Sequence, residues 1–194
     1  MKYCTLCGST VELRVPQGDN LPRHVCAQCG EIHYVNPKVV VGCIPRWQDK
    51  VLLCKRAIEP RLGLWTLPAG FMENNETTIE GAIRETLEEA QARVHIAGLY
   101  TLFNLPHINQ VYVMFLADLV APEFGPGSES TEVALYDERD VPWADMAFPV
   151  VEQTLRLFFE DRRRGRFSVH TGDILRLPGP ERAFNVRMLG AGGG

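Results

Sequence analysis

The sequence lacks the features of several broad classes of protein. It has no apolar run approaching the roughly 20 residues that a membrane-spanning helix needs, and its start, MKYCTLCGST, has no apolar signal core. It contains no internal repeat and no G-x-G-x-x-G dinucleotide motif. It also lacks an excess of basic residues, because the net charge is −4, which argues against broad binding to nucleic acids or anionic membranes. We therefore expect a cytoplasmic protein with neither a membrane nor a nucleic acid as partner.

The overall composition is that of a globular chain. The 194 residues are 45% hydrophobic and 23% charged, which suits one main domain with a small appendage. We expect an N-terminal module over residues 1–35, a main domain over 36–165 and a weakly patterned C-terminal tail over 166–194. The first of these is too short to bury a core of ordinary size.

The six cysteines are of two kinds. Cys43 and Cys54 lie in apolar, strand-like runs and are predicted to be small buried hydrophobic residues. The other four form two C-x2-C pairs separated by residues 8–25: Cys4, Cys7, Cys26 and Cys29. In a cytosolic chain such pairs favour a metal over disulfides, and four thiolates suit a closed, structural Zn2+ site. The sequence therefore predicts a Cys4 zinc ribbon. A ribbon that binds nucleic acid is the alternative, although no strong basic cluster accompanies it.

The main domain alternates strand and helix patterns irregularly. Thr77 and Glu80 form the T-x-x-E pattern of a capping box at a helix start. Together with a hairpin near residue 50, this order favours a mixed α/β sandwich over a doubly wound parallel sheet. The patterns predict strands at 38–44, 51–56, 63–71, 110–120 and 132–137, and helices at 77–92 and 148–164.

The helix predicted at 77–92 places three carboxylates on one face. Glu88 and Glu89 fall within roughly 60° of Glu85 on a helical wheel. Like charges at this spacing cost roughly 0.2–0.5 kcal/mol, a penalty that a hard divalent cation would reverse. The alternative is a solvated acidic face with Arg84 and Arg93 as local partners. The opposite face is expected to pack toward the core and carries Ile79, Ala82, Ile83, Leu87 and Ala90.

The residues around this helix resemble the signature of the Nudix hydrolases. That signature is a glycine, five residues, a glutamate, seven residues and then R-E-U-x-E-E-x-G-U, where U is a bulky aliphatic residue. The matching residues are Gly70, Glu76, Arg84, Glu85, Glu88 and Glu89. Thr86 replaces the first aliphatic residue, Gln91 the glycine and Ala92 the last aliphatic residue. We therefore expect the end of the helix to differ from the family, while the carboxylates are retained.

The resemblance implies a Nudix α/β/α sandwich with a mixed sheet over about residues 37–160, preceded by the zinc ribbon. It also implies metal-dependent hydrolysis of a nucleoside diphosphate linked to another group. Mg2+ or Mn2+ would be the catalytic cofactor. On the family pattern, Glu85 and Glu89 are the main metal ligands, Glu88 contributes, and the Gly70 carbonyl is a further ligand.

Other site residues follow from the same resemblance. Arg84 and Glu76 are expected to pair and to hold the loop against the helix. Family members often take another carboxylate from a loop after the third main strand, and here Glu129 is preferred over Glu132 as metal ligand or base. Ordinary loop charge is the alternative for either residue.

Candidate substrate contacts come from one arginine and three aromatic residues. Arg56 precedes the signature and could contact phosphate, although a surface role is as reasonable. Trp65, Phe103 and Tyr112 could stack on a ring, although aromatic residues in strands usually pack in the core.

The order of motifs bears on the substrate. NADH pyrophosphatases also carry a zinc ribbon, but their S-Q-P-W-P-F-P-x-S motif is absent. The stretches NPKVVVGCI, VLLCKR and GLWTLPAGFME instead resemble plant-type FAD/ADP-ribose pyrophosphatases. This resemblance implies a small-molecule nucleotide substrate, FAD or ADP-ribose, cleaved to AMP and a second monophosphate. Alternatives are an NADH pyrophosphatase, a nucleoside-triphosphate pyrophosphohydrolase, or a non-catalytic regulator that binds a ligand or RNA. Many relatives are dimers, so we expect a homodimer.

Overall fold

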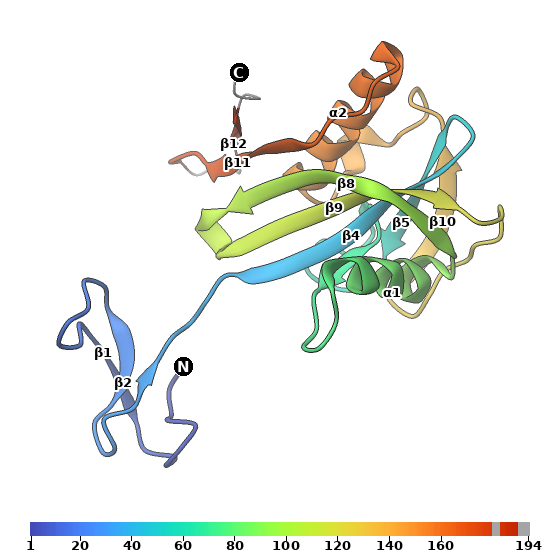
Figure 1. The fold of residues 1–194 in the computed structure, drawn as a ribbon. Helices are drawn as coiled ribbons and strands as arrows, with labels where there is room; N and C mark the ends of the chain where they lie inside the picture. The colour runs from blue at the N-terminus through green and yellow to red at the C-terminus, as the bar shows by residue number, and fades with distance from the viewer. Residues whose placement is uncertain (180–182, 190–194) are drawn as a thin grey trace. The chain divides into compact units, whose positions relative to one another are not determined.

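The computed structural model describes residues 1–179 and 183–189. The chain divides after Pro37 into two compact units, which are considered separately (Figure 1). Among the described residues, no helix combines the length and the apolar character needed to cross a membrane.

The first unit is a small antiparallel sheet. Its three strands are ordered β1-β2-β3, with β1 at Val11–Arg14, β2 at Arg23–Cys26 and β3 at Ile32–His33. Gly8 and Gly30 each follow the second cysteine of a C-x2-C pair and have φ values of 75° and 76°. Glycine adopts this left-handed conformation without steric cost, which lets the chain turn tightly after each pair.

The second unit is built on a mixed sheet with the strand order β10-β5-β4-β9-β8-β11-β12. Strand β4 runs parallel to β9, and β8 runs parallel to β11, while the other neighbours are antiparallel. Figure 1 shows the two long helices, α1 and α2, on opposite sides of the central strands. These features confirm the predicted mixed α/β sandwich. The elements are β4 (Lys38–Trp47), β5 (Lys50–Arg56), β6 (Trp65–Thr66), β7 (Ala69–Phe71), α1 (Thr78–Ala90), β8 (Val94–Leu105), η1 (Pro106–Ile108), β9 (Gln110–Leu119), β10 (Ser130–Tyr136), η2 (Trp143–Asp145), α2 (Pro149–Arg164), β11 (His170–Arg176) and β12 (Phe184–Leu189).

Three parts of the sheet differ from the sequence-based expectation. The single strand expected at 63–71 is two short strands, β6 and β7, which pair with β5 and β4. Strand β8 was not among the predicted strands. The segment expected to be a weakly patterned tail instead contributes β11 and β12 to the sheet, and residues 190–194 lie outside the described part. Pairing of β11 with β8 joins residues far apart in the sequence, so local patterning gave little sign of it.

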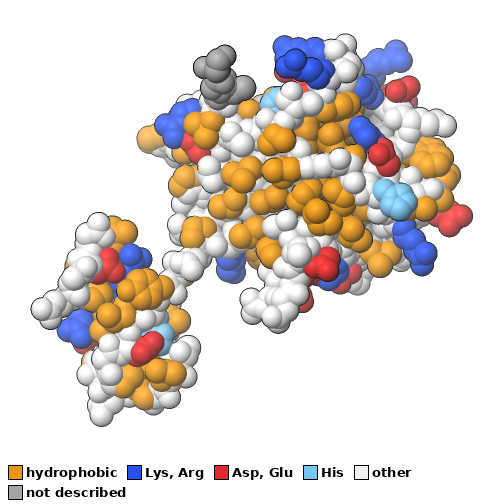
Figure 2. Space-filling view, in the orientation of Figure 1, with side chains coloured by type: hydrophobic (Ala, Val, Ile, Leu, Met, Phe, Trp, Pro, Cys, Tyr) orange, Lys and Arg blue, Asp and Glu red, His pale blue; other side chains and the backbone are white. Residues whose placement is uncertain are grey.

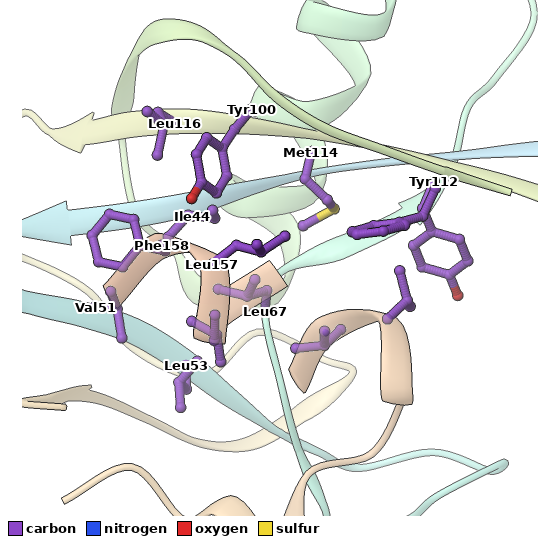
Figure 3. Packing of buried hydrophobic residues seen from close by; sticks show 14 of the residues in the cluster. Ile44, Val51, Leu53, Leu67, Tyr100, Tyr112, Met114, Leu116, Leu157 and Phe158 are labelled. Atoms are coloured by element: carbon purple, nitrogen blue, oxygen red, sulfur yellow. The ribbon is translucent and has the colours of Figure 1, made fainter. Parts of the chain in front are cut away.

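The core lies on both sides of the sheet. On the α2 side, residues from the sheet and from α2 interlock, and Figure 3 shows Tyr112 at the edge of this group with its hydroxyl directed away from the other labelled residues. On the α1 side, Cys43 and Cys54 are buried among aliphatic residues, as predicted.

The apolar face predicted for α1 is only partly correct. Ala82 and Ala90 are buried, but Ile79, Ile83 and Leu87 are 44%, 37% and 49% exposed. The helix instead packs small residues against the sheet. A Cβ atom on Gly81, for example, would lie 2.8 Å from the Val41 side chain.

The exposed side of α1 therefore carries large apolar side chains. Figure 2 shows hydrophobic side chains gathered on the face of the second unit that includes α1. Thr86, which stands where the family signature has an aliphatic residue, is fully buried. Its hydroxyl donates a hydrogen bond of 2.8 Å to the Ala82 carbonyl one turn earlier, so the buried polar group is satisfied.

Candidate active site and zinc site

The four paired cysteines converge in the first unit. Their Sγ atoms all lie within 4.8 Å of one another, with Cys4 3.7 Å from Cys29 and Cys7 3.4 Å from Cys26. A tetrahedral site with Zn–S bonds of about 2.3 Å has sulfur–sulfur edges of about 3.8 Å. Since the ligands are four sulfurs at nearly these separations, the cluster fits Zn2+ in a closed, structural site. His33 Nε2 lies 3.3 Å from Cys4 Sγ and can act as an outer hydrogen-bond partner.

The candidate active site begins with the cap of α1. The Thr77 hydroxyl accepts a hydrogen bond from the Glu80 N–H, and the Glu80 carboxylate accepts one from the Thr77 N–H at 2.8 Å. This is the predicted capping box, and it fixes where the helix starts. The carboxylates of the next three turns are therefore held at set positions relative to β7.

Two of these carboxylates pack against the backbone of β7. The Glu89 carboxylate accepts a hydrogen bond of 3.0 Å from the Ala69 N–H. A Cβ atom on Gly70 would lie 2.3 Å from the Glu85 carboxyl carbon, so only glycine allows this approach. The Gly70 position of the signature thus gives the helix carboxylates direct access to the strand backbone.

The same two carboxylates are poorly solvated. Burial raises the pKa of Glu89 to about 8, and the nearby charges of Glu85 and Glu129 add to the shift. Burial is also the main cause of the raised pKa of Glu85, with Glu88 and Glu129 contributing repulsion. Paired carboxylates that resist ionisation in this way are stabilised in their charged form by a bound cation.

Arg84 is the main counter-charge among these acids. Its guanidinium donates to Glu76 at 2.8 Å, as expected, and also to Glu85 at 2.7 Å and to Glu88 at 3.0 Å. It also donates to the Phe71 carbonyl, which ties the loop to the helix. The Arg84 hydrogen bonds hold the pKa of Glu76 at about 2. Within the described residues, only the four cysteines gather three or more potential ligands within 4.8 Å of one another.

The loop that carries Glu129 is attached to the end of α1. The helix ends at Gln91 in the left-handed conformation, with φ of 49°, so glutamine adopts the geometry that favours glycine. Its side-chain amide donates to the Pro126 carbonyl at 2.7 Å. The Gly125 and Gly127 amides donate to the last carbonyls of the helix, those of Ala90 and Glu89, at 2.8 and 3.1 Å.

These contacts form a strap, which we define as residues 125–129. At Gly127 a Cβ atom would lie 1.6 Å from the Glu88 carbonyl oxygen, so the strap can approach the helix only with glycine there. At its far end the Glu129 carbonyl accepts a hydrogen bond of 2.8 Å from the Ala57 N–H. The strap therefore holds Glu129 beside the helix carboxylates.

A cavity of about 1000 Å3 connects these groups. Of the predicted substrate contacts, Arg56 and Tyr112 line it. The Arg56 guanidinium lies 5.2 Å from the centre of the Phe148 ring and donates to the Pro60 carbonyl. The acidic residues that line the cavity are Glu59, Glu73, Glu85, Glu88, Glu89 and Glu129.

The other two predicted contacts lie in the core. Trp65 is buried and packs edge-on against Tyr136 with ring centres 5.1 Å apart. Phe103 is fully buried. Sequence reasoning also missed four other aromatic residues that do line the cavity. These are Phe71, His107, Phe148 and Phe184. One of them, Phe71, directly follows Gly70 of the signature, which was a signal that could have found it.

Comparisons with known proteins agree with this geometry. The family model described as Nudix N-terminal, a zinc ribbon, matches residues 2–35, and the NUDIX domain model matches residues 36–158. An ADP-ribose pyrophosphatase from Methanocaldococcus jannaschii is 30% identical over 115 residues, which cover 56% of this chain and 67% of that protein. An NAD-capped RNA hydrolase, NudC, from Photobacterium profundum is 26% identical over 80% of this chain. The chain spans 58% of the length of that relative.

Solved structures give the same result. The crystal structure of a Nudix hydrolase from Nitrosomonas europaea is 57% identical, with a TM-score of 0.87, and the match covers 90% of this chain and 99% of that one. An ADP-ribose pyrophosphatase from Streptococcus suis, 23% identical with a TM-score of 0.58, shares the fold over 70% of this chain and 99% of its own. The signature residues, the mixed sandwich and both family models lead to one conclusion: the chain belongs to the Nudix hydrolases and carries a zinc ribbon in front of its Nudix domain.

Proposed function

We propose that this protein hydrolyses the diphosphate bond of FAD or ADP-ribose, giving AMP and a second monophosphate. The observation that carries the proposal is the pairing of Glu85 and Glu89 against the β7 backbone, in a cavity large enough for a dinucleotide. Glu89 is buried, Glu85 is half-buried, and the pKa of each is raised. Such a pair of carboxylates suits a divalent cation, and a divalent cation in turn suits a diphosphate.

Each residue then has a defined part in the reaction. Glu85 and Glu89, with Glu88 and the Gly70 carbonyl, would hold Mg2+ or Mn2+, because hard cations prefer oxygen ligands. When bound, the cation neutralises the diphosphate and stabilises the charge that develops on it. Glu129 accepts the proton of the attacking water as general base.

Two further residues orient the substrate and the site. Arg56 lines the cavity and donates to the substrate phosphate, since a guanidinium matches phosphate oxygens in a bidentate manner. Arg84 holds the helix carboxylates and the loop in register through its hydrogen bonds.

A second candidate substrate is supported by the NudC relatives, whose similarity extends through 80% of this chain. NADH or an NAD-capped RNA end would be the substrate in that case. The absence of the S-Q-P-W-P-F-P-x-S motif favours FAD and ADP-ribose instead. The complete set of carboxylates argues against a non-catalytic regulator.

The direct test is a substrate panel with Mg2+ and, separately, Mn2+. FAD, ADP-ribose, NADH, CoA and a nucleoside triphosphate are incubated with the protein, and products are separated by chromatography. We expect AMP from FAD and ADP-ribose at the highest kcat/KM. Efficient turnover of NADH without turnover of FAD or ADP-ribose would overturn the substrate assignment.

We also propose that the protein is a homodimer that buries the exposed side of α1. Ile79, Ile83 and Leu87 are spaced one turn apart on that helix and are each more than a third exposed. Light scattering coupled to gel filtration should give twice the chain mass. Ile83→Glu should shift the protein toward monomer, whereas the same change at exposed Val169, far from α1 in sequence, should not. A monomeric wild-type protein would contradict this proposal.

A further inference from the structure

The lining of the cavity changes character from one side to the other. The acidic residues come from the loop after β5, from the segments around β7 and α1, and from the strap. Strand β7 pairs with β4. A second group of lining residues comes from η1 and from the last strands of the sheet. Strand β12 is four strand spacings from β4, roughly 19 Å along the sheet at about 4.8 Å per spacing. The second group, here called the aromatic end, consists of Leu105, His107, Ile108, Ile174 and Phe184.

The aromatic end combines two rings with three aliphatic side chains. The rings of His107 and Phe184 are 5.4 Å apart between centres and tilted by 51°. Phe184 is the first residue of β12, and its partner in β11 is Arg176. Ile174, fully buried, forms part of the floor. No carboxylate belongs to this part of the described lining, so it suits an uncharged, planar group.

A sugar fits the aromatic end poorly. Its hydroxyl groups would lose hydrogen bonds to water without gaining partners from Leu105, Ile108 or Ile174, and that loss is costly. A heteroaromatic ring gains stacking and apolar contact there instead. Gln110 also lines the cavity and pairs with Leu105 across β8 and β9, so its amide can donate to and accept from the polar edge of a ring.

We propose that the aromatic end binds the adenine ring of the substrate, with Phe184 as the stacking residue. This inference rests on the proposed function. FAD and ADP-ribose share only their adenosine diphosphate half, so one ring site serves both only if it takes the adenine. The diphosphate then extends from the aromatic end toward Arg56 and the carboxylates.

The proposal assigns a role to a segment outside the shared domain. The match to the NUDIX domain model ends at residue 158, and both Ile174 and Phe184 lie beyond it. The strands that follow α2 therefore complete the cavity with residues from outside the match to the NUDIX domain model. Specificity for the ring would be set by β12, and catalysis by the signature residues.

The test measures nucleotide binding as well as turnover. AMP and ribose 5-phosphate are titrated into the wild-type protein, Phe184→Ala and Phe184→Leu by calorimetry. We expect AMP to bind about 5- to 150-fold more weakly to both variants, because each loses the stacking of one base. Binding of ribose 5-phosphate, which has no base, should be unchanged. Phe184→Tyr should restore AMP binding. On ADP-ribose, KM should rise by a similar factor while kcat changes little.

Phe167→Ala is the matched control. Phe167 is 37% exposed and packs on Tyr100 and Phe158, and it is not among the residues that line the cavity. This variant should bind AMP as the wild type does. Three results would overturn the proposal. They are equal AMP affinity in the wild type and Phe184→Leu, absence of AMP binding by the wild type, and loss of ribose 5-phosphate binding in Phe184→Leu to the same extent as AMP binding. The titrations measure binding without hydrolysis. The adenine site can therefore be disproved while hydrolysis of FAD or ADP-ribose is still observed, and hydrolysis can be absent while AMP still binds at Phe184.

Discussion

Glu89 is the residue whose surroundings depart furthest from those of a surface glutamate. Its carboxylate is buried, accepts a hydrogen bond from Ala69 and faces the charges of Glu85 and Glu129. The sequence predicted the shared face of these carboxylates from helical spacing alone. It did not predict their burial, which depends on the close approach of β7 at Gly70.

Glu129 and Glu132 can be compared directly, because they are three positions apart at the start of β10. Glu129 lines the cavity, whereas Glu132 is exposed and pairs with Lys55 at 3.5 Å. If Glu129 is the general base, Glu129→Gln should lower kcat by about 10²- to 10⁴-fold. Glu132→Gln should leave kcat near the wild-type value. Steady-state kinetics on ADP-ribose would check this, and equal kcat values for the two variants would exclude the assignment.

Glu76 should make stability depend on pH. Arg84 holds its pKa at about 2 in the folded protein, below its ordinary 4.5. A depressed carboxyl pKa stabilises the folded state above the unfolded pKa, and this contribution is lost as the pH falls toward the folded pKa. The stability advantage of the wild type over Glu76→Gln should therefore be largest above pH 4.5 and shrink as the pH falls from there toward 2. Urea unfolding at several pH values measures the free energy of unfolding of both proteins. A difference between them that stays constant on acidification would contradict the assigned pairing of Glu76 with Arg84.

At the scale of elements, the end of α1 is where this chain departs from the family signature. The backbone at Gln91 has the left-handed geometry that suits the glycine of the family signature. Unlike glycine, Gln91 also has a side chain, which donates a hydrogen bond to the Pro126 carbonyl in the strap. Gln91→Gly should keep the helix end, relieve the left-handed strain and remove this tie.

The expected result of Gln91→Gly is a looser strap. Hydrogen exchange at the Gly125 and Gly127 amides should become faster, and kcat should fall because Glu129 is less well positioned. Gln91→Asn, which tolerates the same φ value, is the control for backbone geometry. Unchanged exchange at both amides in Gln91→Gly would show that the side chain does not hold the strap.

The zinc ribbon should depend on its metal for structure. Its few buried residues include Cys4, Val25 and Cys26, so little apolar core remains without the ion. Cys26→Ser should reduce bound zinc below one ion per chain and make residues 1–37 sensitive to protease. The melting of the second unit should change little, because that unit has its own core. Protease resistance of 1–37 in a zinc-free variant would contradict this account.

The elements also show which kinds of structure sequence reasoning could reach. Strongly patterned segments such as β4, β5, β9 and both helices were predicted to within a few residues. The strands that were not predicted are β8, β11 and β12. Strand β8 pairs with its sequence neighbour β9, and β12 with its sequence neighbour β11, but the pairing of β11 with β8 joins distant parts of the chain, and the local patterns of all three are weak. The exposed apolar side of α1 was misjudged because periodicity identifies an apolar stripe without saying what covers it.

For the whole molecule, the cavity is assembled from almost the full length of the second unit. Residues near position 56, the signature, the strap, the start of α2 and β12 all line it. The signature carboxylates Glu85, Glu88 and Glu89 were accessible to sequence reasoning because they are close together along the chain. The aromatic end was not, since Phe184 meets His107 only through the pairing of β11 with β8.

The measurement that tests the central claim most directly is kcat for AMP release from ADP-ribose by Glu85→Gln and Glu89→Gln, with Mg2+ present. Both carboxylates would hold the catalytic cation, so each variant should lose at least about 10²-fold in kcat. Both should keep the wild-type circular dichroism spectrum, and Glu132→Gln should keep wild-type kcat. Hydrolysis at the wild-type rate by both folded variants would show that Glu85 and Glu89 do not hold the catalytic metal.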